Sequence, residues 1–273
     1  MHGMHARLPK NFVLEERIER YAKAIEFEPT RLRGLWAEAC RPLGTGAGPF
    51  REVRVDLGCG KGTFAVESAL REPDVLFVAI DSEPICVAYA AQHAVEAGCA
   101  NVVVVPGNAT QLTAMFGPGE VGRLHINFPT PFPRKKVAAN RLTIIDRLME
   151  YRQVLAQGAE LELRTDSEPF FLFTLTQLQI AGYEVSWATD SLRERCPDAV
   201  ASEYELRLAE QGATVHALAA TAGPAPAHVE QTAELSLAEY LPKDLSKLDY
   251  VPHGMQATVV NLRNRAAKRS SLQ

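Results

Sequence analysis

The fold of this chain is decided by the stretch Val55-Asp56-Leu57-Gly58-Cys59-Gly60-Lys61-Gly62. A short apolar run ends at an acidic residue, and three glycines follow at alternate positions. Glycine adopts left-handed backbone conformations readily, and it lets the main chain approach a ligand without a Cβ clash. The stretch therefore predicts a strand, a tight ligand-binding turn and the start of a helix.

The segments on both sides of this turn alternate between strand and helix patterns. Short apolar or β-branched runs predict strands at 53–57, 75–80, 102–105, 124–128, 161–163, 183–188 and 214–220. Apolar residues at helical spacing predict helices at 63–70, 84–97, 111–116, 142–155 and 170–180. This alternation indicates an α/β fold with a doubly wound, mostly parallel seven-stranded sheet. The last two strands are expected to form an antiparallel hairpin at its edge, because only a turn or two of helix is expected between them.

Two extensions flank the α/β domain, which is expected at residues 49–222. Residues 1–48 are interpreted as an N-terminal helical extension, with apolar residues at helical spacing over 14–25. Gly223-Pro224-Ala225-Pro226 predicts a linker, and residues 223–273 form a C-terminal extension with a possible strand at 257–262 and a basic end. This extension could cap the sheet, mediate dimer contacts or add RNA affinity, and the chain is expected to be a monomer or a homodimer.

Composition narrows the class of protein. Hydrophobic residues make up 47% and charged residues 23%, as in globular proteins. The five cysteines are odd in number and lack C-x-x-C spacing, so neither a disulfide framework nor a metal site is predicted. No apolar run approaches the ~18 residues of a membrane span, and no secretory signal is recognised, which favours a cytoplasmic protein without a membrane partner. The formal charge of -4 means that an RNA site would have to be a local basic patch.

Acidic and polar residues follow the first three predicted strands. Asp56 precedes the glycine turn, where it would repel a pyrophosphate, so a cationic amino-acid ligand such as S-adenosylmethionine fits Asp56, Gly58 and Gly60 better. Asp81 ends the next strand, roughly 20–25 residues further on, where an acid binds ribose hydroxyls. Asn108 follows the third strand and could read the adenine edge. The alternatives are a nicotinamide dinucleotide site, or a glycine turn with a solvated acid and no ligand.

A proline-rich loop, Asn127-Phe128-Pro129-Thr130-Pro131-Phe132-Pro133, follows the fourth strand. Ligands of doubly wound sheets lie at the carboxyl ends of the strands, so this loop should border the cofactor. Its prolines stiffen the backbone, and its phenylalanines could stack on a flat base or lie in the core. Four basic residues come directly after it: Arg134, Lys135, Lys136 and Arg141. They suit contacts with RNA phosphates, although a solvated charge run is the alternative.

Four segments, in this order, resemble the bacterial tRNA (guanine-N7)-methyltransferases, the TrmB family. The first is the glycine turn at 55–62. The second is Ile126-Asn127-Phe128-Pro129-Thr130-Pro131-Phe132-Pro133-Arg134-Lys135-Lys136, which is similar to the family's F-P-D-P-W-x-K-K stretch. The third and fourth are Leu163-Arg164-Thr165-Asp166, similar to its T-D motif, and Ser202-Glu203-Tyr204-Glu205 with Gly212, similar to its T-x-Y-E…G segment. The proline motif is specific and the glycine motif generic, and the resemblance covers residues 7–221.

The resemblance implies the Rossmann-like fold of class I S-adenosylmethionine-dependent methyltransferases, and methylation of guanine N7 in tRNA, at a guanosine of the variable loop. It implies roles at the matched positions. The cofactor would be bound by Asp56, Gly58, Gly60, Asp81, Asn108 and Thr130. The target nucleotide or the methionine end of the cofactor would be contacted by Arg134, Asp166, Ser202 and Glu205. RNA would be contacted by Lys135, Lys136 and Arg141.

The chain departs from the family pattern at four of these positions. Thr130 stands where the family has a catalytic aspartate, while Phe132 replaces a tryptophan, Arg134 a lysine and Ser202 a threonine. Only Thr130 changes the chemical type, and losing one electrostatic contact typically costs ~10²–10³ in rate. Glu205 or Asp166 could compensate. The alternatives are a tRNA- and cofactor-binding relative with weak or no turnover, a methyltransferase with another RNA target, a plain RNA-binding protein, or a small-molecule methyltransferase.

Overall fold

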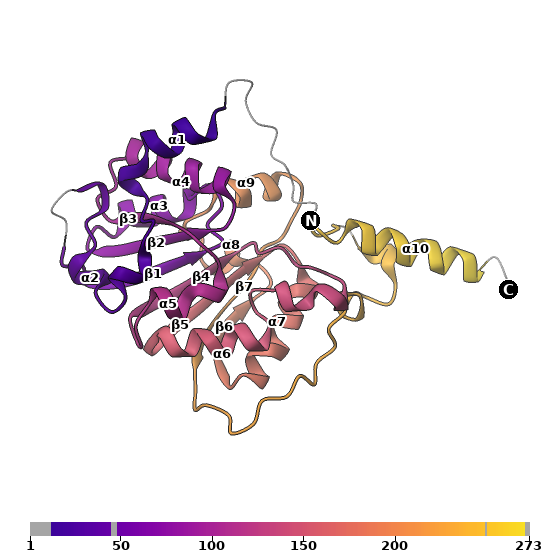
Figure 1. The fold of residues 1–273 in the computed structure, drawn as a ribbon. Helices are drawn as coiled ribbons and strands as arrows, with labels where there is room; N and C mark the ends of the chain where they lie inside the picture. Colours follow the sequence, from indigo (N-terminus) through magenta and orange to yellow (C-terminus); the bar gives the residue numbers. More distant parts are fainter. Residues whose placement is uncertain (1–11, 45–47, 249, 271–273) are drawn as a thin grey trace.

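The computed structural model describes residues 12–44, 48–248 and 250–270, and its centre is one seven-stranded sheet with the strand order β3-β2-β1-β4-β5-β7-β6 (Figure 1). The strands are β1 (Glu52–Leu57), β2 (Val75–Asp81), β3 (Val102–Pro106), β4 (Val121–Asn127), β5 (Leu155–Thr165), β6 (Tyr183–Thr189) and β7 (His216–Ala222). Strands β1 to β5 pair in parallel, and β7 lies antiparallel between β5 and β6. The predicted doubly wound sheet with an antiparallel edge pair is confirmed.

Helices cover both faces of this sheet. The α-helices are α1 (Leu14–Arg20), α2 (Trp36–Ala39), α3 (Thr63–Arg71), α4 (Pro84–Glu96), α5 (Leu112–Met115), α6 (Ile145–Val154), α7 (Glu168–Ile180), α8 (Leu192–Arg195), α9 (Glu203–Glu210) and α10 (Gln256–Ser270). The 3₁₀ helices are η1 (Ala22–Ala24), η2 (Pro29–Leu32), η3 (Pro42–Gly44), η4 (Ala109–Gln111), η5 (Lys135–Asn140), η6 (Leu237–Tyr240) and η7 (Leu245–Lys247). In Figure 1, α1, α3 and α4 lie on one face of the sheet and α5, α6 and α7 on the other.

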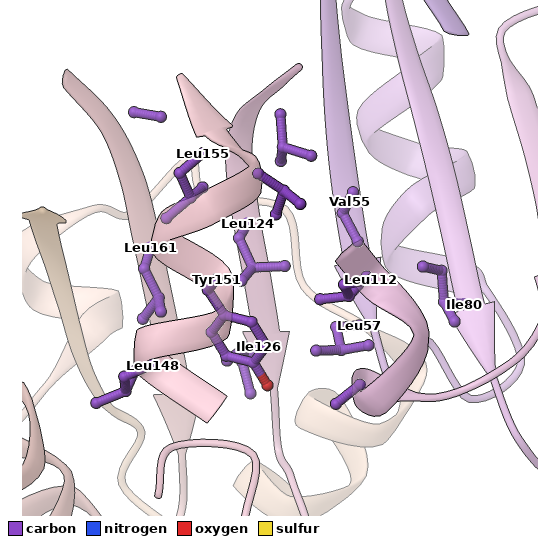
Figure 2. Packing of buried hydrophobic residues seen from close by; sticks show 14 of the residues in the cluster. Val55, Leu57, Ile80, Leu112, Leu124, Ile126, Leu148, Tyr151, Leu155 and Leu161 are labelled. Carbon is purple, nitrogen blue, oxygen red and sulfur yellow. The ribbon is translucent and has the colours of Figure 1, made fainter. Parts of the chain in front are cut away.

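Each face of the sheet has its own hydrophobic core, because successive side chains of a strand point to opposite faces. In β2, Leu76, Val78 and Ile80 belong to the cluster under α5 to α7, while Phe77 and Ala79 pack with α3 and α4. Figure 2 shows the first cluster, in which side chains of β1, β4 and β5 meet those of α5 and α6. The central strands are therefore buried on both faces, which explains their continuous apolar runs.

The turn from β1 to α3 depends on its glycines. Gly58, Gly60 and Gly62 have φ angles of 78°, 55° and 75°, in the left-handed region that favours glycine. The amides of Gly58 and Cys59 donate to the Ile80 carbonyl, at 2.8 and 3.0 Å. A Cβ on Gly62 would lie 2.7 Å from the Ala90 Cβ, so the close packing of α3 on α4 leaves no room for a side chain there.

Two expectations about the second half of the chain need correction. The strand expected at 257–262 is wrong, because this segment lies inside α10. Its β-branched residues suggested a strand, but no strand of the described residues pairs with it, and the residues that follow are mainly good helix formers. The helix expected at 142–155 begins only at Ile145, and β5 begins at Leu155, earlier than expected. Between β6 and β7 the structure has two short helices, α8 and α9.

The residues after the Gly-Pro segment pack on the domain. Leu237 is fully buried, and its amide donates to the Pro133 carbonyl at 3.0 Å. Gln231 exchanges side-chain amide hydrogen bonds with the buried Gln177 of α7. No helix within the described ranges is long and apolar enough to cross a membrane, and the side chains described there contain no cluster of three or more His, Cys, Asp or Glu residues suited to a metal ion.

Gly62→Ala should destabilise the fold more than Gly98→Ala. Both glycines have a positive φ, so alanine costs about 1–2 kcal/mol of conformational energy at either position. A Cβ on Gly98 meets nothing within 4 Å, whereas one on Gly62 overlaps Ala90 and should cost about 1–3 kcal/mol more. Urea unfolding of the two variants measures the difference. Equal losses of stability would show that the α3–α4 contact yields without strain.

Candidate functional site

The candidate site lies where the carboxyl ends of β1 and β4 diverge. The chain runs from β1 to β2 and β3 on one side and returns to β4 on the other side of β1, so the strand order reverses between β1 and β4. Open α/β sheets bind ligands in the crevice at such a switch point. The Asn127 side-chain amide spans it, donating to Asp56 Oδ1 at 3.1 Å.

Asp56 is a buried carboxylate with unused hydrogen-bonding capacity. Its side chain is 1% exposed, and Oδ2 is buried without a hydrogen-bond partner among the residues that the structure describes. Burial raises the pKa of Asp56 to about 6, although His125 and the Asn127 hydrogen bond act in the opposite direction. An oxygen of this kind can accept a hydrogen bond from a cationic ligand.

Asp81 fixes the glycine turn and ends the neighbouring strand. Its Oδ2 accepts from the Gly60 amide and its Oδ1 from the Glu83 amide, both at 2.8 Å. Burial is the main reason why the pKa of Asp81 is raised, and these two amide hydrogen bonds oppose it. A Cβ on Gly60 would meet nothing within 4 Å, so this turn faces open space.

Asn108 stands beyond the third strand of the same edge. The Gly107 amide donates to the Asp81 carbonyl at 3.0 Å, which places Asn108 beside the end of β2. Its side chain is exposed and caps η4, accepting from the Thr110 amide at 2.9 Å. The structure thus brings Asp56, Asp81 and Asn108 to the ends of three adjacent strands.

The proline loop is held in a strained conformation. Phe128 and Phe132 have φ angles of 50° and 45°, which bulky residues rarely adopt. The Phe128 amide donates to the Arg164 carbonyl at 2.7 Å, which ties the loop to β5. Thr130, between the two phenylalanines, is exposed. Strain of this kind costs on the order of 1–3 kcal/mol per residue and clusters at functional sites.

The prediction that Arg141 contacts RNA is wrong, because this side chain is fully buried beneath the proline loop. Its guanidinium donates to the carbonyls of Pro131, Phe132 and Leu235 at distances of 2.7 to 3.2 Å. It lies over the Phe173 ring at 4.3 Å, and burial lowers its pKa to about 10. Arg141 therefore supports the loop from inside the protein.

Arg134, Lys135 and Lys136 are exposed beside the same loop, as a surface for RNA requires. Lys135 and Lys136 open η5, and Arg134 immediately precedes it. Their contact with RNA stays a prediction. The basic run therefore divides into three surface cations and one buried support.

Asp166 already has hydrogen-bond partners from the C-terminal extension. Its Oδ2 accepts from the Tyr250 hydroxyl at 2.7 Å and from the His253 amide at 2.9 Å. The His253 ring stands edge-on to Tyr204, with centroids 6.3 Å apart, and Tyr204 in turn stands edge-on to Phe128 at 5.5 Å. Sequence reasoning missed Tyr250 and His253, because nothing in the pattern of the extension links it to this edge.

Ser202 and Glu205 have structural contacts at the start of α9. The Ser202 hydroxyl caps the helix, accepting from the Glu205 amide at 3.1 Å. Glu205 is 2% exposed and pairs with Arg193, and its Oε2 lies 3.8 Å from Arg164. Glu205 is therefore paired with the partly exposed Arg193, and its contact with the target nucleotide stays a prediction.

The start of α9 also lies against the glycine turn. Lys61 Nζ and Glu203 Oε2 are 3.8 Å apart, and the Glu203 amide donates to the Thr63 hydroxyl at 3.3 Å. The four sequence segments singled out above thus converge at one edge of the sheet.

Comparison with known proteins identifies related chains. A family model described as "Putative methyltransferase" matches residues 51–218. The tRNA (guanine-N(7)-)-methyltransferase of Geobacillus kaustophilus is 33% identical over 211 residues, which are 77% of this chain and 94% of that protein. The enzyme of the same name from Brevibacillus brevis is 32% identical over 71% of this chain and 88% of its own length.

Solved structures show the same fold. The 16S rRNA methyltransferase KamB superposes with a TM-score of 0.52 and 20% sequence identity, over 64% of this chain and 89% of that chain. An antibiotic-related methyltransferase gives 0.51 and 19% identity, over 63% and 87%. These likenesses confirm the predicted Rossmann-like methyltransferase fold.

Asp56→Asn should stabilise the ligand-free protein at about pH 8. Because the folded pKa is raised, the native state binds this proton more tightly than the unfolded state, so the ionised carboxylate destabilises the fold above about pH 6. The rise of the Asp56 pKa from 3.8 to about 6 sets an upper bound of about 3 kcal/mol on this gain. The gain should shrink as pH falls through about 6 and vanish below about 4.

Chemical unfolding of wild type and variant across this pH range measures that gain. Asp198→Asn, which removes an exposed carboxylate, is the control and should show no such trend. A loss of stability for Asp56→Asn at about pH 8 would contradict the destabilising effect assigned to the buried, ionised carboxylate.

Arg141→Lys should destabilise the protein, whereas Arg134→Lys should not. Lysine keeps the charge of Arg141 but cannot reach three carbonyls with a planar fork, and each hydrogen bond of a charged group contributes about 1.5–3 kcal/mol. Arg134 is exposed, so the same change there removes little. Thermal unfolding distinguishes the two variants, and equal melting temperatures would refute the supporting role of Arg141.

Proposed function

Since this chain belongs to the tRNA (guanine-N7)-methyltransferase family, we propose that it transfers a methyl group from S-adenosylmethionine to N7 of a guanine in tRNA. The observation that carries the proposal is the meeting of two features at one switch point. The unpartnered carboxylate oxygen of Asp56 suits the cofactor, and the strained proline loop with its exposed cations suits the RNA.

The residues of the β1–β3 edge fit the cofactor. Asp56 Oδ2 would accept a hydrogen bond from the cofactor's ammonium group, and the turn at Gly58 and Gly60 leaves room for close approach. Asp81 would bind the ribose hydroxyls, and Asn108 would contact the adenine. When bound, S-adenosylmethionine supplies a methyl group activated by a positively charged sulfur.

The chemistry at guanine demands little proton transfer. N7 carries a lone pair on the major-groove edge of the base and no proton, so no strong base is needed. The protein has to align this nitrogen with the methyl group, and good alignment is worth up to ~7–11 kcal/mol. The stiff loop around Phe128 and Phe132 would hold the base in place.

A carboxylate near the base would stabilise the positive charge that appears on the purine ring. Thr130 has no charge, and Glu205 is 2% exposed and already paired with Arg193. Asp166 is the remaining candidate for this carboxylate. It directly follows β5, and the Arg164 carbonyl near the end of that strand anchors the proline loop. We assign the compensating charge to Asp166, held in position by Tyr250 and the His253 amide.

We expect the cations next to the proline loop to contact the RNA backbone. Arg134, Lys135 and Lys136 are exposed and would bind phosphates on either side of the target nucleotide. Because the overall charge is -4, the chain as a whole does not attract tRNA. We therefore expect tRNA to bind at this local concentration of positive charge.

The test is methyl transfer from labelled S-adenosylmethionine to unmodified bulk tRNA, with the product nucleoside identified by mass spectrometry. We expect 7-methylguanosine. Another methylated nucleoside would move the target, and tRNA binding without any product would identify a relative that lacks turnover.

The assignment of Asp166 is tested in the same assay. Asp166→Asn, whose oxygen can still accept from Tyr250, should lower kcat by roughly 10²–10³. Thr130→Asp should change kcat by less than about 10-fold, because Asp166 already supplies the charge, and Thr130→Asn controls for the change of shape. A gain of about 100-fold for Thr130→Asp alone would show that the wild-type site lacks this charge.

A further inference from the structure

The C-terminal helix α10 projects away from the body of the protein. Figure 1 shows its far end well separated from the sheet. The helix has 15 residues and is therefore about 22 Å long. Met255, just before the helix, and Val259 in its first turns are buried, while most of the described side chains beyond them are exposed. The first turns of the helix are thus packed on the domain, and further along Arg263 donates to the Leu245 carbonyl at 3.0 Å.

The charge of α10 has one sign. Residues 256–270 contain no acidic residue and four basic ones, Arg263, Arg265, Lys268 and Arg269. Of these, Arg263, Arg265 and Lys268 have described side chains, and all three are exposed. In a chain whose formal charge is -4, such a helix is a local concentration of positive charge.

The segment that leads into α10 lies beside the proline loop, at the carboxyl ends of the central strands. We refer to this part of the molecule as the reaction edge. A Cβ on Gly254 would lie 3.0 Å from the Pro131 side chain, so the main chain that leads into the helix touches the proline loop. A few residues earlier, Tyr250 and His253 hydrogen-bond to Asp166. The position of the helix is therefore fixed relative to the place proposed for the target guanine.

We propose that α10 is a second RNA-binding surface, an arm that contacts the phosphate backbone of the tRNA while the target guanine lies at the proline loop. This inference rests on the proposed function and adds a surface outside the matched residues 51–218. Phosphate is the partner that matches an exposed helix with basic residues and no acids. A second copy of this chain is a poorer match, since α10 offers little exposed apolar surface beyond Val260.

Arg265→Gln with Lys268→Gln tests the arm without altering the residues at the reaction edge. The affinity for bulk tRNA is measured between roughly 50 and 200 mM salt, together with the KM for tRNA in the methylation assay. If both cations bind phosphates, affinity at low salt should fall about 10-fold, and the slope of log K against log salt should become shallower by about 1.4–1.8. KM should rise more than kcat falls.

The matched control removes two exposed arginines from the opposite edge of the sheet, Arg33→Gln with Arg41→Gln. The Gly34 amide next to Arg33 bonds to Glu120, which directly precedes β4, and Arg41 lies against Gly48, ahead of β1. The net charge changes by the same amount as in the α10 double variant. If α10 contacts the RNA, the control variant should therefore reduce tRNA affinity much less than the α10 variant does.

Three outcomes would overturn the inference. Equal effects of the two pairs would indicate net charge alone. If the α10 double variant bound tRNA as tightly as the wild type, the arm would make no contact with the RNA. If its affinity were unchanged but light scattering showed a different oligomeric state, α10 would be an interface between copies. If the wild-type protein neither binds nor methylates tRNA, the proposed function itself fails, which separates that failure from failure of the arm.

Discussion

The geometry of the reaction edge depends on one buried cation. Arg141 donates to the backbone of the proline loop at Pro131 and Phe132 and to Leu235 of the C-terminal extension, and it stacks on Phe173 of α7. A planar guanidinium can bind several carbonyls at fixed angles, which a loop of alternating prolines cannot do for itself, since proline lacks an amide donor. The left-handed conformations of Phe128 and Phe132 persist because this support and the β5 contact hold them. Catalysis by alignment needs a loop that is rigid before the substrate arrives.

Opposite charges are kept apart along this edge. The acidic residues Asp56 and Asp81 lie at the ends of β1 and β2, where we propose that the cofactor binds, and the exposed cations follow β4, where we propose that the RNA binds. The buried, unpartnered oxygen of Asp56 lowers the stability of the fold, a cost that is typical of the functional site proposed here. The same separation gives a chain with a net negative charge a local surface of positive charge, to which we assign the RNA.

The sequence predicted the sheet, its switch point and the antiparallel edge pair, because periodicity reports which face of an element is buried.

The sequence could not distinguish Arg141 from Arg134, since a basic run looks the same whether its members face solvent or a loop carbonyl. Nothing local in the sequence indicates that Glu205 pairs with Arg193 and lies near Arg164. The segment 257–262 has strand-like residues, but strands need partners, and none of the strands that the structure describes pairs with it. The contact of Tyr250 with Asp166 joins residues that are far apart in the chain, so local patterns do not contain it.

The contact between Asp166 and the C-terminal extension also bears on how this protein can be divided. The family match ends at residue 218, but two partners of Asp166 and one carbonyl that binds Arg141 come from residues after it. A truncation at residue 218 would remove both of these partners of Asp166 and one of the carbonyls that hold Arg141 beneath the proline loop, even with every matched motif intact. A chimaera that transplants the shared domain into another member would face the same defect. The matched residues 51–218 therefore do not contain all the contacts that hold Asp166 and the proline loop in place.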